Sequence, residues 1–177
     1  MRKQVMNFPN KDETPEAGFS VVELLIVIAV VAIVTTYSLI SFRTSSKTFN
    51  VAGATRNLTA YLEKARVDAV RRHVTDGSAR VDINSTSSYS VNMDFNGNGT
   101  PSARTITLPA GTTLSYTLPP ATTSTDPSST PISIQYDWRG RTTSTVLVTL
   151  TDSTAGVTPS TIVVGPAGDL STDTTVT

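Results

Sequence analysis

The first strong pattern along the chain is an almost unbroken apolar run. It extends from Phe19 to Ile40, and Glu23 is the only charged side chain within it. A helix over this run would be about 33 Å long at about 1.5 Å per residue, enough to cross the roughly 30 Å hydrocarbon core of a bilayer. The run therefore predicts a membrane-spanning helix, residues 19–41, with one acid close to its start.

Beyond this run the apolar residues repeat every three or four positions, which is typical of an amphipathic helix. The repeating positions are Ala54, Leu58, Leu62, Ala65, Ala69 and His73. No proline occurs between Phe19 and Pro101, and Asp76-Gly77-Ser78 supplies a stop signal. We therefore expect one long helix whose second half, residues 42–76, packs against a head domain. Gly53 would be a weak point in it, because an interior glycine costs about 1 kcal/mol relative to alanine.

After Gly77 the apolar residues alternate with polar ones, and Ser and Thr dominate. Alternation of this kind predicts half-buried strands in an antiparallel sheet. The predicted strands are residues 79–84, 88–94, 104–108, 112–118, 131–137, 145–151 and 161–164. A stretch rich in Pro, Ser and Thr, residues 119–131, predicts a loop. The expected fold is α+β, with a long N-terminal helix packed on an antiparallel β-sheet head formed by residues 77–177.

Composition narrows the classes of protein that this fold can represent. The chain has 177 residues, which suits one anchor and one modest head, and its 14 basic and 14 acidic side chains cancel. No overall field therefore favours nucleic acid, although residues 43–80 are locally basic. The sequence contains no cysteine, which excludes disulfides, thiolate catalysis and cysteine-bound metals.

The isolated Glu23 allows two interpretations. An acid costs roughly 2.5–3.5 kcal/mol at the centre of a membrane and less near its surface. Glu23 could therefore lie shallow, with its carboxylate among the lipid headgroups. Alternatively, it meets a positive partner when the helix leaves the lipid for a bundle of protein helices.

The residues around Glu23 form a recognisable motif. The stretch Gly18-Phe19-Ser20-Val21-Val22-Glu23-Leu24-Leu25 closely resembles the processing signal of type IV prepilins and type II secretion pseudopilins. The resemblance implies a pilin-like fold and cleavage by a prepilin peptidase between Gly18 and Phe19, which removes residues 1–18 as a leader. It also implies N-methylation of Phe19, and a role for Glu23 in pairing with the free amine of a neighbouring subunit during assembly.

The head resembles one branch of the same family. Residues 132–141, 146–150 and 162–168 look like the C-terminal half of GspH/FimT-type minor pseudopilins, where a strand, a Gly-Arg turn and two further strands close the head. Many major pilins close a C-terminal loop with a disulfide, which a cysteine-free chain cannot do. The resemblance therefore favours a minor subunit.

One loop of the head has the spacing of a cation-binding site. Asp94, Asn96 and Asn98 place oxygen atoms at alternate positions before Gly99, as in the opening of a calcium loop. Thr105 stands where such a loop would carry its bidentate glutamate, so Asp137 or backbone carbonyls would have to complete the shell. The simpler interpretation is a hairpin turn, because Asn-Gly is a strong turn signal.

A second loop combines an aromatic ring with positive charge. The residues around Gly140 are Trp138, Arg139 and Arg141. The two arginines could bind the phosphate backbone of a nucleic acid, and the tryptophan could stack on a base. The simpler interpretation is a turn whose tryptophan packs on the head. His73 is the only histidine, and no nucleophile elbow, phosphate loop or histidine-based metal motif accompanies it.

The sequence as a whole predicts a non-enzymatic minor pilin or pseudopilin that binds no required cofactor. Its expected partners are other pilin or pseudopilin subunits, the prepilin peptidase, an inner-membrane assembly platform and the lipid bilayer. It would cross the inner membrane once, with its leader in the cytoplasm and its head in the periplasm, and then enter a pilus or pseudopilus. Two alternatives remain open: a filament-displayed minor pilin that binds DNA or acts as an adhesin, and a membrane-anchored periplasmic enzyme.

Overall fold

The computed structural model describes residues 18–173, and for Ile40 it describes the backbone alone. Most of the predicted leader, residues 1–17, lies outside the described residues. Within residues 18–173 the chain forms one α-helix, α1 (Val21–Arg72), and eight β-strands. It divides into two units, Met1–Leu39 and Ile40–Thr177, and α1 contributes to both.

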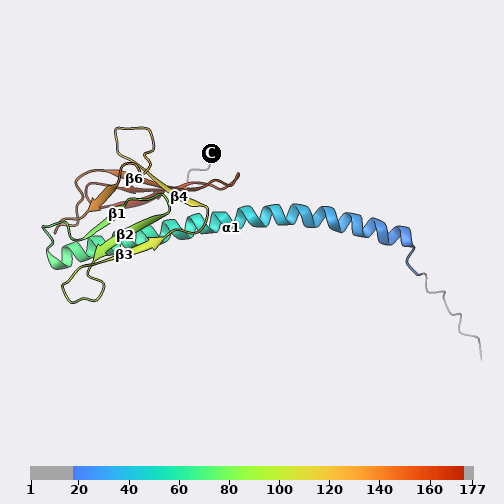
Figure 1. Cartoon of the computed structure of the whole chain (residues 1–177), viewed down its shortest axis with the longest axis horizontal. Helices are drawn as coiled ribbons and strands as arrows, with labels where there is room; N and C mark the ends of the chain where they lie inside the picture. The colour runs from blue at the N-terminus through green and yellow to red at the C-terminus, as the bar shows by residue number, and fades with distance from the viewer. Residues whose placement is uncertain (1–17, 174–177) are drawn as a thin grey trace, which may run out of the picture. The chain divides into compact units, whose positions relative to one another are not determined.

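The strands of the second unit form two antiparallel sheets of four. The strands are β1 (Arg80–Ile83), β2 (Ser88–Met93), β3 (Ser102–Thr107), β4 (Thr112–Thr117), β5 (Ile132–Gln135), β6 (Val146–Asp152), β7 (Ser160–Val164) and β8 (Leu170–Asp173). One sheet has the order β3-β2-β1-β5 and the other β4-β6-β7-β8. Figure 1 labels β1, β2 and β3 of the first sheet and β4 and β6 of the second. The predicted α+β fold, with the helix packed on antiparallel strands, is confirmed.

The core of the second unit lies between α1 and the two sheets. Alternate strand residues are buried, as at Val81, Ile83, Val91 and Met93, while their neighbours are partly exposed. The helix contributes Val51, Ala54, Leu58, Leu62, Ala65 and Ala69 to the same core. The predicted helical stripe is therefore confirmed up to Ala69.

The end of the helix differs from the prediction. α1 ends at Arg72, one turn before the predicted end at Asp76, because His73 adopts a left-handed conformation with φ of 53°. The backbone N–H of Val74 then donates to the carbonyl of Ala69 at 3.0 Å, which closes the last turn. Val74 is buried, whereas His73 is exposed and lies outside the core stripe in which it was expected.

The strand predictions were right in number and order up to β7 but incomplete. The predicted bounds differ from the observed ones by one to two residues at most ends, as is usual where strands fray into turns. β8 was missed, because its sequence Leu-Ser-Thr-Asp carries a single apolar residue. Pairing with β7 through Val164 and Leu170 forms this strand, so tertiary contact overrides its weak local pattern.

Candidate functional site

The processing motif lies at the start of α1, and Ser20 is the residue that caps the helix. Its hydroxyl accepts a hydrogen bond from the backbone N–H of Val22 at 3.3 Å, and its carbonyl accepts one from Leu24 at 3.1 Å. Ser20 satisfies one of the unpaired N–H groups that every helix exposes at its start. Gly18 and Phe19 precede the cap and are exposed, so the bond between them lies outside the helix.

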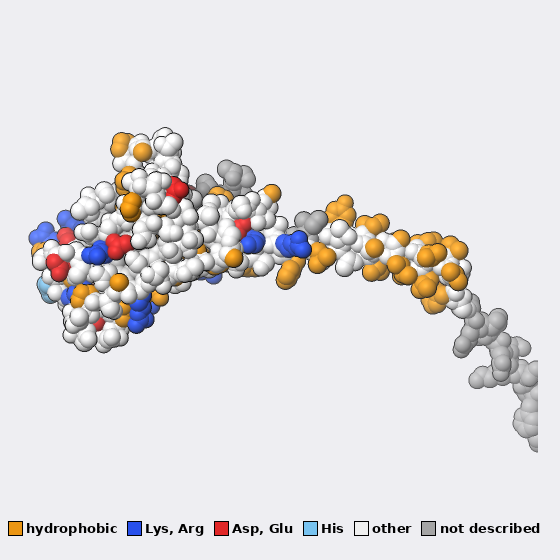
Figure 2. Space-filling view, in the orientation of Figure 1, with side chains coloured by type: hydrophobic (Ala, Val, Ile, Leu, Met, Phe, Trp, Pro, Cys, Tyr) orange, Lys and Arg blue, Asp and Glu red, His pale blue; other side chains and the backbone are white. Residues whose placement is uncertain are grey.

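Glu23 lies in the first turn of α1, where the helix dipole favours a negative charge. Its side chain is exposed, and it is the only charged group among the described residues of this first unit. Around it the aliphatic side chains of residues 21–39 are also exposed, and Figure 2 shows hydrophobic side chains covering this stretch. Within residues 18–173, α1 is the one helix long and apolar enough to cross a membrane. One acidic side chain thus lies at one end of a long apolar surface.

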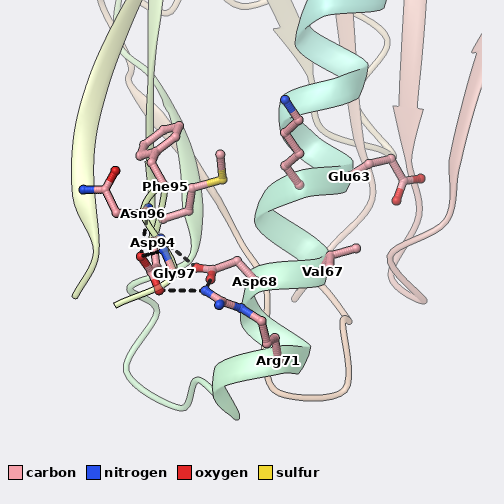
Figure 3. Close-up of a pocket in the computed structure, with 10 residues that line it drawn as sticks. Glu63, Val67, Asp68, Arg71, Asp94, Phe95, Asn96 and Gly97 are labelled. Atoms are coloured by element: carbon pink, nitrogen blue, oxygen red, sulfur yellow. Dashed lines mark hydrogen bonds and ion pairs between the residues drawn. The ribbon is translucent and has the colours of Figure 1, made fainter. Parts of the chain in front are cut away.

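A second cluster of charge lies where the end of α1 meets the loop after β2. The side chain of Asp94 accepts hydrogen bonds from the backbone N–H groups of Asn96, Gly97, Asn98 and Gly99, at 2.7–3.2 Å. The guanidinium of Arg71 reaches the same carboxylate at 2.7 Å (Figure 3). Asp94 therefore orders the loop around itself and is held to the helix by Arg71.

Asp68 completes this cluster from the helix side. Its carboxylate accepts hydrogen bonds from Arg71 at 3.0 Å, from Arg72 at 2.7–3.0 Å and from the backbone N–H of Asp94 at 3.1 Å. Burial by itself would raise the pKa of Asp68, but the hydrogen bonds from Arg72, the Asp94 backbone and Arg71 outweigh it and lower that pKa. Burial likewise opposes ionisation of Asp94, yet the Gly99 N–H and Arg71 lower its pKa to about 2.

These lowered pKa values predict that the head loses stability in acid. A carboxyl group whose pKa is lower in the folded than in the unfolded chain stabilises the fold at neutral pH, and this stability is lost as pH falls through the folded pKa. For Asp68 and Asp94 we expect the loss to develop between about pH 5 and pH 2. Thermal unfolding of the full chain from pH 7 to pH 2 measures it. Asp94→Asn should flatten the profile, and identical profiles for the two proteins would contradict the assignment.

The three proposed calcium ligands do not converge in the described structure. The side-chain oxygen of Asn98 accepts the N–H of Thr100 at 2.9 Å, and Figure 3 shows the side chain of Asn96 pointing away from Asp94. Asp137 lies in another turn, where it accepts hydrogen bonds from backbone N–H groups. Within residues 18–173 no cluster of three His, Cys, Asp or Glu side chains could hold a metal. Calcium binding stays a prediction, and the loop has the hydrogen bonds of a self-capped turn.

The loop that contains Trp138 is a tight turn between β5 and β6. The backbone N–H groups of Arg139 and Arg141 donate to the side chain of Asp137 at 2.9 and 2.8 Å. The guanidinium of Arg139 lies over the Trp138 ring at 4.4 Å, and that ring also stacks on His73 at 6.4 Å between centroids. Trp138 is 42% exposed, so the two neighbours leave much of the ring accessible.

The Trp138 turn is also the place where three distant parts of the head meet. Arg66 of α1 donates to the carbonyl of Gly140 at 3.2 Å. Gly168, in the turn between β7 and β8, lies against the same carbonyl with no room for a side chain. The turn thereby joins the helix to the C-terminal hairpin. Whether Trp138, Arg139 and Arg141 contact DNA stays a prediction.

The sequence analysis did not identify Asp68, Arg71 and Arg72 as an ion-pair cluster. Their spacing of three and four residues on a helix was a usable signal for local ion pairing. The link to Asp94 was not readable, because it depends on how the loop after β2 folds back onto the helix.

Comparison with known proteins gives one match. Residues 14–39 match the family model described as the prokaryotic N-terminal methylation motif. The matched segment includes Gly18, Phe19 and Glu23 and stops before the head. No curated protein and no solved structure matches the chain. The motif supports a relationship of this chain to pilins and pseudopilins. It therefore also supports processing by a prepilin peptidase, anchoring in the inner membrane and assembly with other pilins.

Proposed function

We propose that the chain is a minor pilin or pseudopilin, a structural subunit that is cleaved, methylated and then assembled into a type IV pilus or a type II secretion pseudopilus. The observation that carries the proposal is the match of residues 14–39 to the methylation motif, at the start of a helix whose apolar surface is exposed. The likeness of the head to GspH/FimT-type pseudopilins favours the minor role.

The proposed mechanism begins in the membrane, where residues 19–41 hold the precursor and the leader faces the cytoplasm. The prepilin peptidase hydrolyses the peptide bond after Gly18, so that the amine of Phe19 becomes the new N-terminus and receives a methyl group. That amine is positively charged at neutral pH. When an assembly platform moves the helix from lipid into a bundle of subunits, the carboxylate of Glu23 pairs with the amine of a neighbour.

The pairing has a physical reason. A charge taken out of water costs several kcal/mol unless an opposite charge meets it at close range. Each copy supplies one amine and one carboxylate near the same end of its helix, so neighbouring copies can neutralise one another. The same bundle would cover the apolar side chains of residues 21–39. This accounts for their exposure in the single chain.

The two alternatives receive less support from the head. An enzyme would often need a carboxyl group with a raised pKa, and the resolved shifts of carboxyl groups in residues 18–173 are all downward. A DNA-binding tip would use Arg139 and Arg141, but the guanidinium of Arg139 already lies over Trp138. Neither observation favours a function other than assembly.

The direct test is the mass of the mature N-terminus. We expect the protein purified from its native membrane to begin at Phe19 and to carry one methyl group on the α-amine. Gly18→Val should leave the leader attached, because a side chain at this position would obstruct cleavage. A wild-type protein that retains residues 1–18 in cells with an active peptidase would overturn the proposal.

A further inference from the structure

The loop after β2 contains two Asn-Gly sequences, Asn96-Gly97 and Asn98-Gly99. No other asparagine of the sequence precedes a glycine. An asparagine is most prone to deamidate before glycine, because glycine has no side chain to keep its own backbone nitrogen away from the asparagine side chain. Spontaneous deamidation of this chain is therefore expected first in the loop after β2.

Deamidation is an attack by the backbone on a neighbouring side chain. For Asn96, the backbone nitrogen of Gly97 loses its proton to the solvent and forms a bond with the side-chain Cγ, and the side-chain amide nitrogen leaves as ammonia. Water then opens the five-membered imide, and the product is aspartate or isoaspartate. The reaction needs a backbone nitrogen that is free to lose its proton and free to reach Cγ.

One carboxylate holds both of the nitrogens that would react. The backbone N–H of Gly97 donates to the side chain of Asp94 at 2.7 Å, and that of Gly99 donates to it at 2.8 Å. These are the two shortest of the four hydrogen bonds that Asp94 accepts from the loop. The side chain of Asp94 is fully buried, so water does not compete for these hydrogen bonds.

A carboxylate in this position opposes the attack in two ways. The nitrogen anion that begins the reaction would lie beside the negative charge of Asp94, and a nearby like charge disfavours ionisation. The N–H group is also held in place, and a hydrogen bond to a charged group lowers the population of the free N–H by roughly tenfold to a hundredfold. Because the pKa of Asp94 is lowered to about 2, its carboxylate is ionised at neutral pH and both effects persist there.

The two asparagines differ in how their own side chains are held. The side-chain oxygen of Asn98 accepts the backbone N–H of Thr100 at 2.9 Å, which restrains that side chain. Asn96 is exposed and makes no side-chain hydrogen bond within residues 18–173, and Figure 3 shows its side chain pointing away from Asp94. The hydrogen bond from Gly97 to Asp94 is therefore the main restraint on deamidation of Asn96.

We propose that Asn96 is a latent deamidation site, which Asp94 keeps closed in the folded head by binding the backbone N–H of Gly97. Opening of the loop releases both Asn-Gly sequences together, and Asn96 reacts first because its side chain is free. This site does not depend on the function proposed above, because only the loop and Asp94 take part in the reaction.

The reaction would be a one-way step for the loop. Aspartate at position 96 adds a second negative charge close to Asp94, and like charges at short range repel each other. Isoaspartate lengthens the backbone by one carbon, so the N–H groups of the loop no longer converge on one carboxylate. Either product favours the open loop, and deamidated Asn96 thus records that the loop has opened.

The rate of deamidation in the full chain tests the proposal. Asp94→Ser removes the carboxylate and keeps a short polar side chain. Wild type and variant are incubated in detergent at mildly alkaline pH, and the tryptic peptide 81–104 is followed by tandem mass spectrometry. We expect Asn96 to deamidate at least about tenfold faster in the variant, with Asn98 second. Asn92, in the same peptide, is the internal reference and should not change.

Arg71→Gln is the matched control for Asp94→Ser. It removes the ion pair between α1 and Asp94 but leaves the carboxylate to the N–H groups of the loop. We expect Asn96 to deamidate at a rate close to that of wild type, with thermal unfolding as the check that both variants are folded. Equal acceleration in the two variants would assign the protection to the stability of the whole head, and it would overturn the proposal.

Measurements on the wild type alone cover the case in which Asp94→Ser does not fold. Asn96 should deamidate at least about tenfold more slowly in the folded chain than in the same chain unfolded by guanidinium chloride. Hydrogen exchange measured by NMR should show slowed exchange of the Gly97 and Gly99 amides in the folded chain. Equal deamidation in the two states, or exchange of these amides as fast as in the unfolded chain, would overturn the proposal.

Discussion

Glu23→Gln should abolish assembly while leaving insertion into the membrane intact. The substitution keeps the shape of the side chain but removes the charge that would meet a neighbour's amine. Breaking a buried ion pair by removing one partner costs roughly 3–5 kcal/mol, which lowers an assembly equilibrium by about two to four orders of magnitude. Filaments or pseudopili sheared from cells and quantified by immunoblot measure the effect, with membrane fractions as the check on insertion.

Ser20→Ala is the matched control for Glu23→Gln. Ser20 caps the same helix turn, and its loss should cost about 1 kcal/mol of helix stability without changing charge. We expect this variant to assemble at close to wild-type levels. If both variants assembled normally, the carboxylate would have no pairing role. If both failed equally, the start of the helix rather than its charge would be the requirement.

Asp68→Ala should be the most destabilising single substitution in the head's charged cluster. Asp68 is 5% exposed and accepts hydrogen bonds from Arg71, Arg72 and the backbone of Asp94. Removing it leaves Arg72 without its ion-pair partner and the backbone N–H of Asp94 without its acceptor, so that only Arg71 still links the Asp94 loop to the helix. We expect a loss of roughly 3–5 kcal/mol of unfolding free energy, measured by denaturant unfolding of the full chain in detergent.

Glu63→Gln provides the comparison for Asp68→Ala. Glu63 also pairs with an arginine three residues away on α1, but its contact with Arg66 is long, at 3.9 Å, and both side chains are partly exposed. Exposed pairs of this kind contribute about 0.5 kcal/mol or less. A similar loss of stability for both variants would show that the buried cluster has no special role.

The sequence predicted those parts of the structure that depend on local pattern. The apolar run, the helical stripe through Ala69 and the alternation at Val81 and Ile83 each follow from residues within one turn or one strand. Burial of the helical stripe and of Val81 and Ile83 follows directly, because each of these two patterns has one face that must avoid water. The α+β class follows from their order along the chain.

The parts that could not be predicted depend on contacts between distant segments. Asp94 has the spacing of a calcium ligand, yet the structure gives its carboxylate to four backbone N–H groups and to Arg71, a residue of the helix. The helix stops at His73, where a left-handed backbone and the Trp138 ring come together, although the local sequence favours a stop at Gly77. Arg71 lies 23 residues before Asp94, and Trp138 lies 65 residues after His73, so neither contact could be read from the local sequence.

The meeting of Arg66, Gly140 and Gly168 has a consequence for the order in which the head folds. The carbonyl of Gly140 is held from one side by the helix and from the other by the turn between β7 and β8. The helix is synthesised first, but this contact cannot form until the chain has been translated as far as Gly168. A chain interrupted before Gly168 would leave the apolar stripe of α1 partly open to proteases and chaperones, so the β7–β8 turn is needed before the head can close.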